Sequence, residues 1–473
     1  MGGDDCLGTG WGAGFSGGAG VFATTGGDTC RDFLLGSKGF ASSKYARIVS
    51  GTTIRIINFF MKNKKITLAI LKEARNDENR APFSPAQISS LLDEFSYLKI
   101  IVQPSKKRCF KDEDYQKAGA QLTEDLNSAD IIFGVKEVDI SKLIKDKTYL
   151  FFSHTSKVHQ YINKIIKDEA VIYKKELLKE VIKKNITLID YENLRDTSGE
   201  GYRYLGFGRF AGIIGTYNTL NLYLKLYHKQ ALARAFEINN YEEIKKLISK
   251  QNFNKLKILL TGSGRASKGA IEMLECANIK QVSINDYLNK KYDEAIFTNI
   301  SAKDHVERKD GENSSYQDYI LNPHKYDSKV KKYLFNADML IACHYWDPKF
   351  PKLFTPNQIN EFKNLKIIGD VTCDINGSVP TTIRSSSIEK PYYSIEIDSM
   401  KEIDLGTRGI AVMAVDNLPS ELPADATEEF GSNVMSEILP YLLGKDDGRI
   451  NRATTASNGK FLSNFTYLND FVN

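Results

Sequence analysis

Residues 256–270 read Leu256-Lys257-Ile258-Leu259-Leu260-Thr261-Gly262-Ser263-Gly264-Arg265-Ala266-Ser267-Lys268-Gly269-Ala270. The apolar run has the length of a buried strand, it enters a Gly-x-Gly turn, and the helical pattern Ile271–Leu274 follows. Gly262 permits the tight turn, and Gly264 lets the backbone approach a pyrophosphate at the positive end of the helix. Because Ser267 stands where the third fingerprint glycine is expected, a plain strand–helix turn is the alternative. The stretch predicts a dinucleotide-binding turn made by Gly262, Ser263, Gly264, Arg265 and Ala266.

A candidate ribose-binding acid follows this turn. The next strand-like stretch, Gln281–Ile284, leads to Asp286, which lies about 20 residues past the turn, where such an acid is expected. If Asp286 sits at the strand tip, its carboxylate favours NAD, because it would repel the 2′-phosphate of NADP. If the strand ends sooner, NADP stays open, with Arg265 or Lys268 available to its phosphate. The sequence therefore predicts NAD or NADP without choosing between them.

Two apolar runs farther upstream each end in titratable side chains. Ala129–Glu137 ends in Lys136 and Glu137, and Tyr149–His154 ends in His154. In open α/β sheets the carboxyl ends of the strands face the ligand crevice. We therefore expect these three side chains to gather at one site suited to acid/base chemistry near neutral pH. The alternatives are a solvated lysine at a strand end and a hydrogen-bonded structural histidine.

Composition excludes several classes of protein. The 64 basic and 59 acidic residues give a formal charge of +5, which is too mild to indicate nucleic-acid binding. No apolar run approaches the roughly 18 residues of a membrane span. The six cysteines contain neither a C-x-x-C pair nor a zinc spacing, so we expect no metal site and a reducing, cytoplasmic compartment.

The chain divides into an unusual leader and two alternating regions. Residues 1–60 hold 14 of the 34 glycines, so we expect this leader to be disordered or not native to the protein. Strands and helices alternate over 61–207 and again over 208–416, and the last sixty residues look helical. This alternation predicts two α/β domains with mostly parallel sheets. The expected elements include strands over 66–70, 99–103 and 186–190 and helices after Ser84-Pro85, near 113–120 and around 158–167.

A series of motifs in the same order resembles a known family. The chain is similar to lysine-forming saccharopine dehydrogenases, in particular to the lysine-ketoglutarate reductase domain of the bifunctional lysine-degrading enzyme. It more distantly resembles alanine dehydrogenase and transhydrogenase. The resemblance covers about 66–443 and rests on Lys72–Arg75, Asn79–Pro85, Val102–Ser105, Arg108–Phe110, Gly134–Glu137, Phe151–Thr155, Gly206–Gly212, Cys343–Pro348, Asp370–Ser378 and Met413–Pro419.

The resemblance implies a fold and an activity. The fold is two Rossmann-like domains flanking a cleft, as in alanine dehydrogenase. Domain I, over 61–207 and completed by 417–473, binds substrate, and domain II, over 208–416, binds the dinucleotide. The activity is the NAD(P)-dependent interconversion of lysine plus 2-oxoglutarate with saccharopine. Because the resemblance ends with the chain, we expect any later step of the bifunctional enzyme to need a separate protein.

The resemblance also implies roles for single residues. The catalytic lysine and histidine of the family correspond to Lys136 and His154. Carboxylates of the substrate site that tune this pair correspond to Glu137 and Glu192. Arginines that bind substrate carboxylates correspond to Arg80 and Arg203, and Tyr202 replaces the arginine that precedes the second of these. Asp416 corresponds to an acid close to the bound ligands, and we assign it to the cofactor side.

Two other functions are compatible with these motifs. One is a reductive aminase of a smaller 2-oxo acid, of the alanine dehydrogenase kind, which would need a smaller pocket. The other is a non-catalytic dinucleotide-binding regulatory protein, which has no chemical need for Lys136, Glu137 and His154. We expect small-molecule partners only, with neither nucleic acid nor membrane, and either a monomer or a homo-oligomer.

Overall fold

The computed structural model describes residues 65–473, apart from 159–160, 163–167, 197–200 and 314. The segment 1–60 that we expect to be a disordered leader lies outside the described residues, and so does most of the helix expected over 158–167. None of the helices described is both long enough and apolar enough to cross a membrane.

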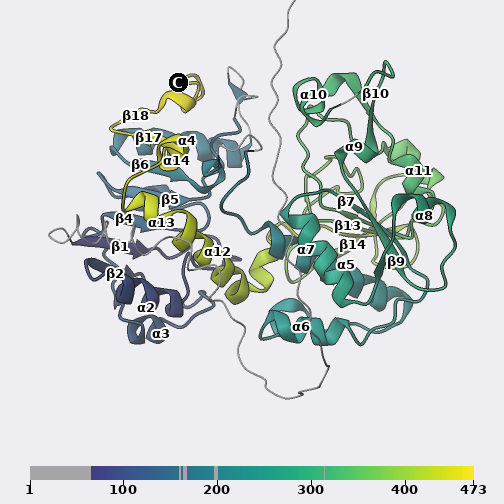
Figure 1. Ribbon diagram of the computed structural model, residues 1–473, viewed down its shortest axis with the longest axis horizontal. Coiled ribbons are helices and arrows are strands. Elements are labelled where there is room, and N and C mark those ends of the chain that lie inside the picture. Colours follow the sequence, from purple (N-terminus) through teal and green to yellow (C-terminus); the bar gives the residue numbers. More distant parts are fainter. Residues whose placement is uncertain (1–64, 159–160, 163–167, 197–200, 314) are drawn as a thin grey trace, which may run out of the picture. The chain divides into compact units, whose positions relative to one another are not determined.

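Domain I is built on an eight-stranded sheet (Figure 1). Its first six strands pair in parallel, and two antiparallel strands from the last part of the chain extend the edge beside β6. In sheet order the strands are β18 (Lys460–Phe461), β17 (Thr454–Ser457), β6 (Thr187–Asp190), β5 (Thr148–Phe151), β4 (Ile131–Phe133), β1 (Ile66–Ile70), β2 (Leu98–Val102) and β3 (Gln121–Leu122).

Helices from two distant parts of the chain pack on this sheet. The helix after Ser84-Pro85 is confirmed: the Ser84 hydroxyl accepts the Gln87 N–H, and the Gln87 side chain accepts the Ser84 N–H. Phe430 and Leu468, from the C-terminal helices, belong to the same hydrophobic core as the strands. The helices are α2 (Pro85–Glu94), α3 (Asp112–Lys117), α4 (Glu169–Lys183), α12 (Pro423–Glu437), α13 (Leu439–Leu442), α14 (Arg449–Ala453) and α15 (Leu468–Val472).

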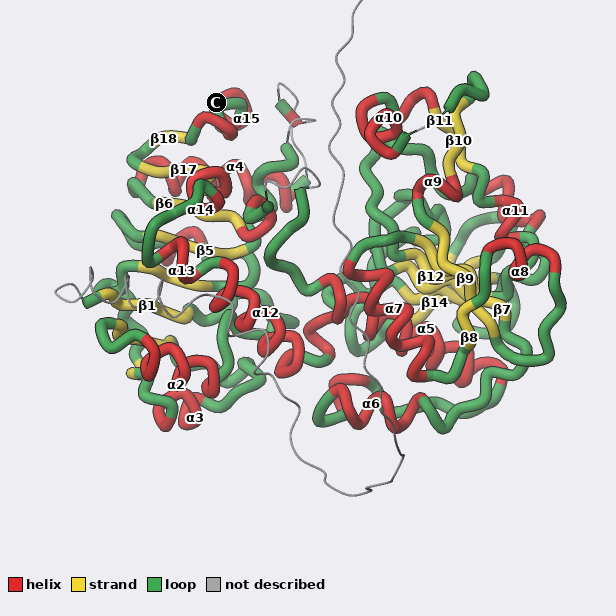
Figure 2. The backbone as a smooth tube through the Cα atoms, viewed as in Figure 1, coloured by secondary structure: helices red, strands yellow, loops and turns green. Residues whose placement is uncertain are grey.

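Domain II has a second eight-stranded sheet, parallel except near one edge, where β14 pairs antiparallel with both of its neighbours (Figure 2). In sheet order the strands are β15 (Glu402–Ile403), β14 (Tyr392–Ile395), β16 (Ile410–Met413), β13 (Ile367–Asp370), β12 (Met339–Ala342), β7 (Lys257–Thr261), β9 (Ile296–Ile300) and β8 (Lys280–Gln281). A separate two-stranded antiparallel sheet pairs β10 (Val306–Arg308) with β11 (Tyr326–Ser328). The α-helices are α5 (Gly208–Tyr227), α6 (Tyr241–Ile248), α7 (Arg265–Cys276), α8 (Ile284–Asn289), α9 (Ala302–His305), α10 (Tyr316–Leu321) and α11 (Lys331–Leu334).

The predicted fold class, two α/β domains with mostly parallel sheets, is confirmed. The strand expected over 281–284 is wrong. Strand β8 ends at Gln281, and Ser283 instead caps helix α8 by accepting the N–H of Asp286 on its hydroxyl. A serine at this position favours the start of a helix over a longer strand. The division of the chain at 207/208 and at 416/417 stays a prediction.

Two glycines let α5 and α7 lie in backbone contact beside the domain II sheet (Figures 1 and 2). A Cβ atom on Gly212 would lie 1.8 Å from the carbonyl oxygen of Ala266, and one on Gly269 would lie 2.0 Å from that of Arg209. Both distances are far below van der Waals contact. Since α7 begins at the Gly-x-Gly turn, this contact fixes the turn to the buried helix α5.

We predict that Gly269→Ala lowers the thermal unfolding midpoint by several degrees, because the added methyl group must push two backbones apart at a cost of about 1–3 kcal/mol. Gly406→Ala is the matched control, since its Cβ would meet only one oxygen at 3.9 Å. Differential scanning calorimetry of both variants provides the comparison. Equal midpoints for the two variants would contradict the proposed role of the helix contact.

Candidate active site

Lys136 and His154 follow two neighbouring central strands of domain I, β4 and β5, at the side of the sheet where the parallel strands end. The pairing of β4 with β5 continues beyond both strands. The N–H of Gly134 donates to Leu150 O at 2.9 Å, and the N–H of Phe152 donates to Val135 O at 3.1 Å. The two turns that carry the candidate acid/base residues are therefore adjacent, as the sequence analysis expects.

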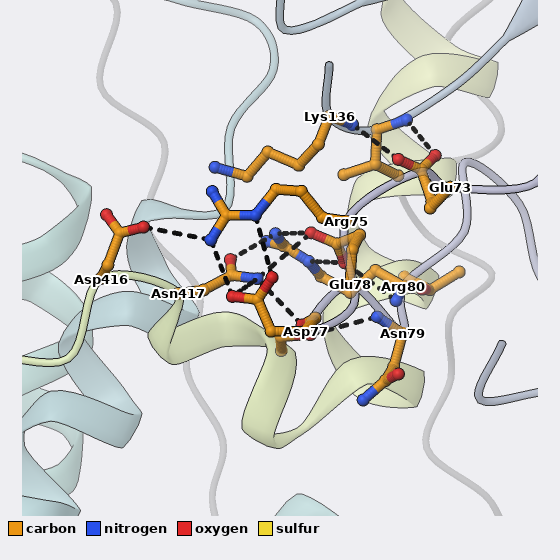
Figure 3. A network of polar contacts seen from close by, with 12 residues as sticks. Glu73, Arg75, Asp77, Glu78, Asn79, Arg80, Lys136, Asp416 and Asn417 are labelled. Atoms are coloured by element: carbon orange, nitrogen blue, oxygen red, sulfur yellow. Dashed lines mark hydrogen bonds and ion pairs between the residues drawn. The ribbon is translucent and has the colours of Figure 1, made fainter. Parts of the chain in front are cut away.

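The turn that carries Lys136 is bound by the buried carboxyl group of Glu73, which follows the end of β1 by three residues (Figure 3). Glu73 is 7% exposed, and its two oxygens accept the N–H groups of Val135 at 2.7 Å and Lys136 at 3.0 Å. Burial raises the pKa of Glu73 to about 8, and the nearby Glu78 carboxylate acts in the same direction, against the two N–H donors. The position of Lys136 thus depends on a side chain that lies far away in the sequence.

The Lys136 ammonium lies in a positively charged and partly buried place. Burial lowers the pKa of Lys136, and the Arg80 and Arg75 guanidinium groups lower it further, while Glu137 acts in the opposite direction. Figure 3 shows the side chain extending toward Arg75. Among the described residues, none forms a hydrogen bond with this ammonium. An amine in such surroundings gives up its proton more readily than a solvated lysine.

Arg80 is not a surface residue. It is 2% exposed, and its Nε and Nη2 atoms donate to the two oxygens of Glu78 at 2.8 and 2.5 Å. Nη2 also donates to the amide oxygen of Asn417 at 2.8 Å, and the guanidinium lies 4.0 Å from the centre of the Phe207 ring. Burial would raise the pKa of Glu78, but Arg80 holds that pKa below its ordinary value. Among the described partners, only Nη1 of Arg80 is left without a hydrogen bond.

Asp416 faces domain I. Its carboxylate lies 3.1 Å from the Nη2 atom of Arg75, which also forms a 2.7 Å ion pair with Asp77. More than half of the Asp416 side chain is exposed. This placement brings Asp416 to the same group of charges as Lys136 (Figure 3), and its predicted role beside the cofactor stays a prediction.

His154 forms a pair with Glu192. The Nδ1 atom of His154 lies 3.3 Å from one carboxylate oxygen of Glu192, and the imidazole stacks on Phe152. The other oxygen lies 3.2 Å from Arg203 and 3.6 Å from Lys157. Burial would raise the pKa of Glu192, but His154 and the two cations hold it well below its ordinary value. Glu192 is therefore ionised, and it attracts the positively charged Lys157 and Arg203 side chains to the surroundings of His154.

The dinucleotide turn has the shape that its glycines predict. Gly262 has φ +107°, and a Cβ atom there would lie 2.6 Å from the Cys343 carbonyl oxygen. Gly264 precedes α7, and a Cβ atom on it would meet nothing within 4 Å. The first N–H groups of a helix have no partner within the helix. Among the described residues, the turn therefore combines open space at Gly264 with the N–H donors of a helix start, which are the features a pyrophosphate site requires.

His344 anchors the beginning of this turn. It is buried between two hydroxyl groups, with Nδ1 2.8 Å from the Thr261 oxygen and Nε2 2.7 Å from the Ser378 oxygen. Burial lowers the pKa of His344 to about 3, so the imidazole is neutral at physiological pH. A neutral ring with two hydrogen-bonded nitrogens fits a structural role for this residue.

Two residues proposed to contact the cofactor are placed differently from the expectation. Asp286 is not at a strand tip: it lies in the first turn of α8, 3.1 Å from Lys290. Arg265 donates to the backbone carbonyls of Arg203 and Tyr204, and its guanidinium lies 4.8 Å from the Tyr202 ring. Arg265 is thus engaged by protein groups, whereas the Lys268 side chain is exposed.

Several residues of this site could not be recognised from the sequence. Glu73, Glu78 and Asn417 are buried and bonded across long sequence separations. No local pattern reveals such contacts. Lys157 follows His154 by three residues, and its nearness to a motif histidine was the one local signal for its place beside Glu192.

We predict that Glu73→Gln flattens the pH dependence of stability. The ordinary pKa of 4.5 rises to about 8 in the folded protein, so the folded state binds this proton more tightly. The free energy of unfolding therefore falls as pH rises from about 4.5 to 8, by up to about 1.4 kcal/mol per unit, and levels off above. The variant lacks this contribution. Thermal midpoints measured across that range test it.

Glu113→Gln, at an exposed position of α3, is the control for this experiment. It should keep the slope of the wild-type protein. The assignment fails if Glu73→Gln shows the same decline between low and high pH as the wild-type chain.

Comparisons with known proteins identify the family of the chain. The profile of the alanine dehydrogenase/PNT N-terminal domain matches residues 69–213, and that of the C-terminal domain matches 235–460. The chain is 29% identical to the mitochondrial alpha-aminoadipic semialdehyde synthase of Bos taurus, covering 85% of this chain and 48% of the relative. It is 23% identical to the saccharopine dehydrogenase [NAD(+), L-lysine-forming] of Emericella nidulans, covering 80% and 92%.

The chain thus spans about half the length of the synthase relatives and most of the length of the fungal one. An L-alanine dehydrogenase structure matches with a TM-score of 0.56 at 16% identity, covering 86% of this chain and 99% of that one. This likeness concerns the fold. The resemblance drawn from the sequence motifs is confirmed, and the chain belongs to the alanine dehydrogenase/PNT family of oxidoreductases.

Proposed function

We propose that this chain catalyses the reductive condensation of lysine with 2-oxoglutarate. Lysine, 2-oxoglutarate, NAD(P)H and a proton give saccharopine, NAD(P)⁺ and water, and the reaction is reversible. The observation that carries the proposal is the pair of adjacent strand ends, one with an amine of lowered pKa at Lys136 and the other with the His154–Glu192 pair.

The chemistry needs groups that move protons in both directions. The ε-amine of the substrate lysine must lose a proton before it attacks the keto carbon, and the resulting carbinolamine must then gain one on its hydroxyl group to lose water. In the proposal Lys136 and His154 carry these protons, and Glu137 and Glu192 tune them. A bound nicotinamide would supply the hydride that reduces the imine.

The substrates carry several carboxylates, and the site offers matching cations. Arg203 and Lys157 lie beside Glu192, and Nη1 of the buried Arg80 has no hydrogen-bond partner in the described part of the chain. Charge-assisted bonds to such groups are among the stronger ones in proteins. In the proposal these three cations bind substrate carboxylates, with Tyr202 replacing a guanidinium at the periphery.

Domain II is the proposed dinucleotide-binding domain. The turn formed by Gly262, Ser263, Gly264, Arg265 and Ala266 would receive the pyrophosphate through its backbone, and Asp416 would lie near the nicotinamide end. The position of Asp286 within α8 removes the reason to prefer NAD, so we propose that NADP is accepted as well. Lys268 is the exposed cation available to a 2′-phosphate.

A reductive aminase of a smaller 2-oxo acid is the second candidate, supported by the fold likeness to alanine dehydrogenase. Such a substrate has one carboxylate. Because Glu78 and Glu192 offset two of the three cations named above, charge alone does not separate the two substrates. The similarity to the lysine-forming saccharopine dehydrogenase favours the larger one.

We predict that Lys136→Met and His154→Gln each lower kcat by about 10²-fold or more, as loss of a proton-transfer group does. The assay follows nicotinamide absorbance with lysine plus 2-oxoglutarate, using NADH and NADPH separately. Lys142→Met is the matched control, because this exposed lysine pairs only with Asp139 at 3.3 Å among the described residues. Unchanged kcat in the first two variants would remove both from the proposed mechanism.

We also predict that Gly264→Ala weakens dinucleotide binding at least about tenfold, a change of about 1.4 kcal/mol, without loss of stability. The methyl group enters space that is open in the protein but lies where the pyrophosphate would approach. NAD(P)H fluorescence titration measures the affinity, with Gly406→Ala as the control. Full affinity in the Gly264 variant would exclude this turn as the pyrophosphate site.

A further inference from the structure

The backbone of His154 is held in a conformation that this residue rarely adopts. Its φ is +51°, in the left-handed region that costs a non-glycine residue about 1–2 kcal/mol. Such a conformation persists only where the surroundings enforce it, and it is enriched at functional sites. The turn Ser153-His154-Thr155 is held in place by hydrogen bonds of the two residues that flank His154.

The two residues that flank His154 are tied together by their hydroxyl groups. Ser153 and Thr155 are both 0% exposed, and their side-chain oxygens are 2.8 Å apart. The Ser153 hydroxyl donates to the Oδ2 atom of Asp190 at 2.6 Å. Because a serine has a single hydroxyl proton, Thr155 must be the donor to Ser153. The hydrogen bonds thus run in one direction, from Thr155 through Ser153 to Asp190.

Asp190 also holds the partner of His154. It is the last residue of β6, it is fully buried, and it pairs with Phe151 at the end of β5. Its second oxygen, Oδ1, accepts the N–H of Glu192 at 2.8 Å and caps the short 3-10 helix Tyr191–Asn193. One carboxylate therefore bonds to the turn that carries His154 and to the turn that carries Glu192.

We propose that Asp190 is a positioning residue that sets the geometry of the His154–Glu192 pair through Ser153 and through the Glu192 backbone. It is too deeply buried to touch substrate, so it acts through the two groups it holds. The importance of the pair for turnover rests on the proposed function, whereas its geometry does not.

The test uses two variants that cut the link to His154 in different ways. Ser153→Ala removes the hydroxyl that joins the turn to Asp190, and Thr155→Val removes the donor while keeping the shape of the side chain. Asp190→Asn is the conservative variant: its amide can donate to Ser153 while its oxygen still accepts the Glu192 N–H. Ser394→Ala is the matched control, because Ser394 is equally buried but its hydroxyl group bonds only to the backbone of Gly406 among the described residues.

Two readouts separate positioning from mere stability. The first is kcat and KM for each substrate. The second is the ¹³Cε1–¹H resonance of His154 in histidine-labelled protein, assigned by its disappearance in His154→Gln among the signals of the six histidines. We expect Ser153→Ala to lower kcat about tenfold or more, to leave the KM for the dinucleotide unchanged, and to shift the His154 resonance. Thr155→Val should have smaller effects of the same kind, and Asp190→Asn should retain most of the activity.

The proposal is overturned if Ser153→Ala and Ser394→Ala lower the thermal midpoint alike while kcat and the His154 resonance keep their wild-type values. If the wild-type protein does not convert lysine plus 2-oxoglutarate with either NADH or NADPH, the proposed function fails. The resonance then still decides the role of Asp190: a shift in Ser153→Ala supports it, and no shift refutes it.

Discussion

A buried carboxyl group needs hydrogen-bond partners for its oxygens, and this requirement shapes both halves of the candidate site. Glu73, just beyond β1, accepts two N–H groups from the turn after β4. Asp190, at the end of β6, accepts the Ser153 hydroxyl from the turn after β5. In each case the carboxylate comes from the strand that is paired with the one it supports. The turns satisfy the buried acids, and the acids fix the turns that carry Lys136 and His154.

The charges around these turns are arranged in two groups with different consequences. Around Lys136, burial and the Arg80 and Arg75 guanidinium groups disfavour a further positive charge, so the pKa of the lysine falls. Around His154, the ionised Glu192 attracts Lys157 and Arg203. The carboxyl ends of the parallel strands thus carry two features side by side. Lys136 loses its proton more readily than a solvated lysine, and Lys157 and Arg203 provide positive charge for anionic substrates.

Local sequence patterns predicted those features of the fold that depend on a few neighbouring residues, such as buried strands, helix starts and tight turns. The apolar runs identified β1, β2, β4, β5 and β6 of the first sheet and β7 of the second, Ser84-Pro85 identified the start of α2, and the glycine at 262 identified the tight turn after β7. Most strands of the second sheet were not predicted, and β17 and β18 lie in the last sixty residues, which we expected to be helical. The prediction over 281–284 failed because the apolar Val282 and Ile284 look like a strand, whereas the hydroxyl of Ser283 starts a helix. Only the tertiary structure decides between these two readings of such a short segment.

The candidate site was predictable to a different extent. Lys136 and His154 could be found because each directly follows an apolar strand. Glu73 and Asp190 could not be assigned to them, since their contacts join residues about 40 to 60 positions apart in the sequence. The burial of Arg80 was likewise hidden, because a guanidinium beside two acidic residues usually belongs to the surface.

The most direct test of the account follows atoms from substrates to product. The protein is incubated with [ε-¹⁵N]lysine, 2-oxoglutarate and nicotinamide cofactor that carries deuterium at the transferred position, and the products are analysed by mass spectrometry. The account predicts one new compound that contains the carbon skeletons of both substrates, the ¹⁵N label and one deuterium atom. A deuterated amino acid without the lysine skeleton, or no deuterated product with either cofactor, would contradict it.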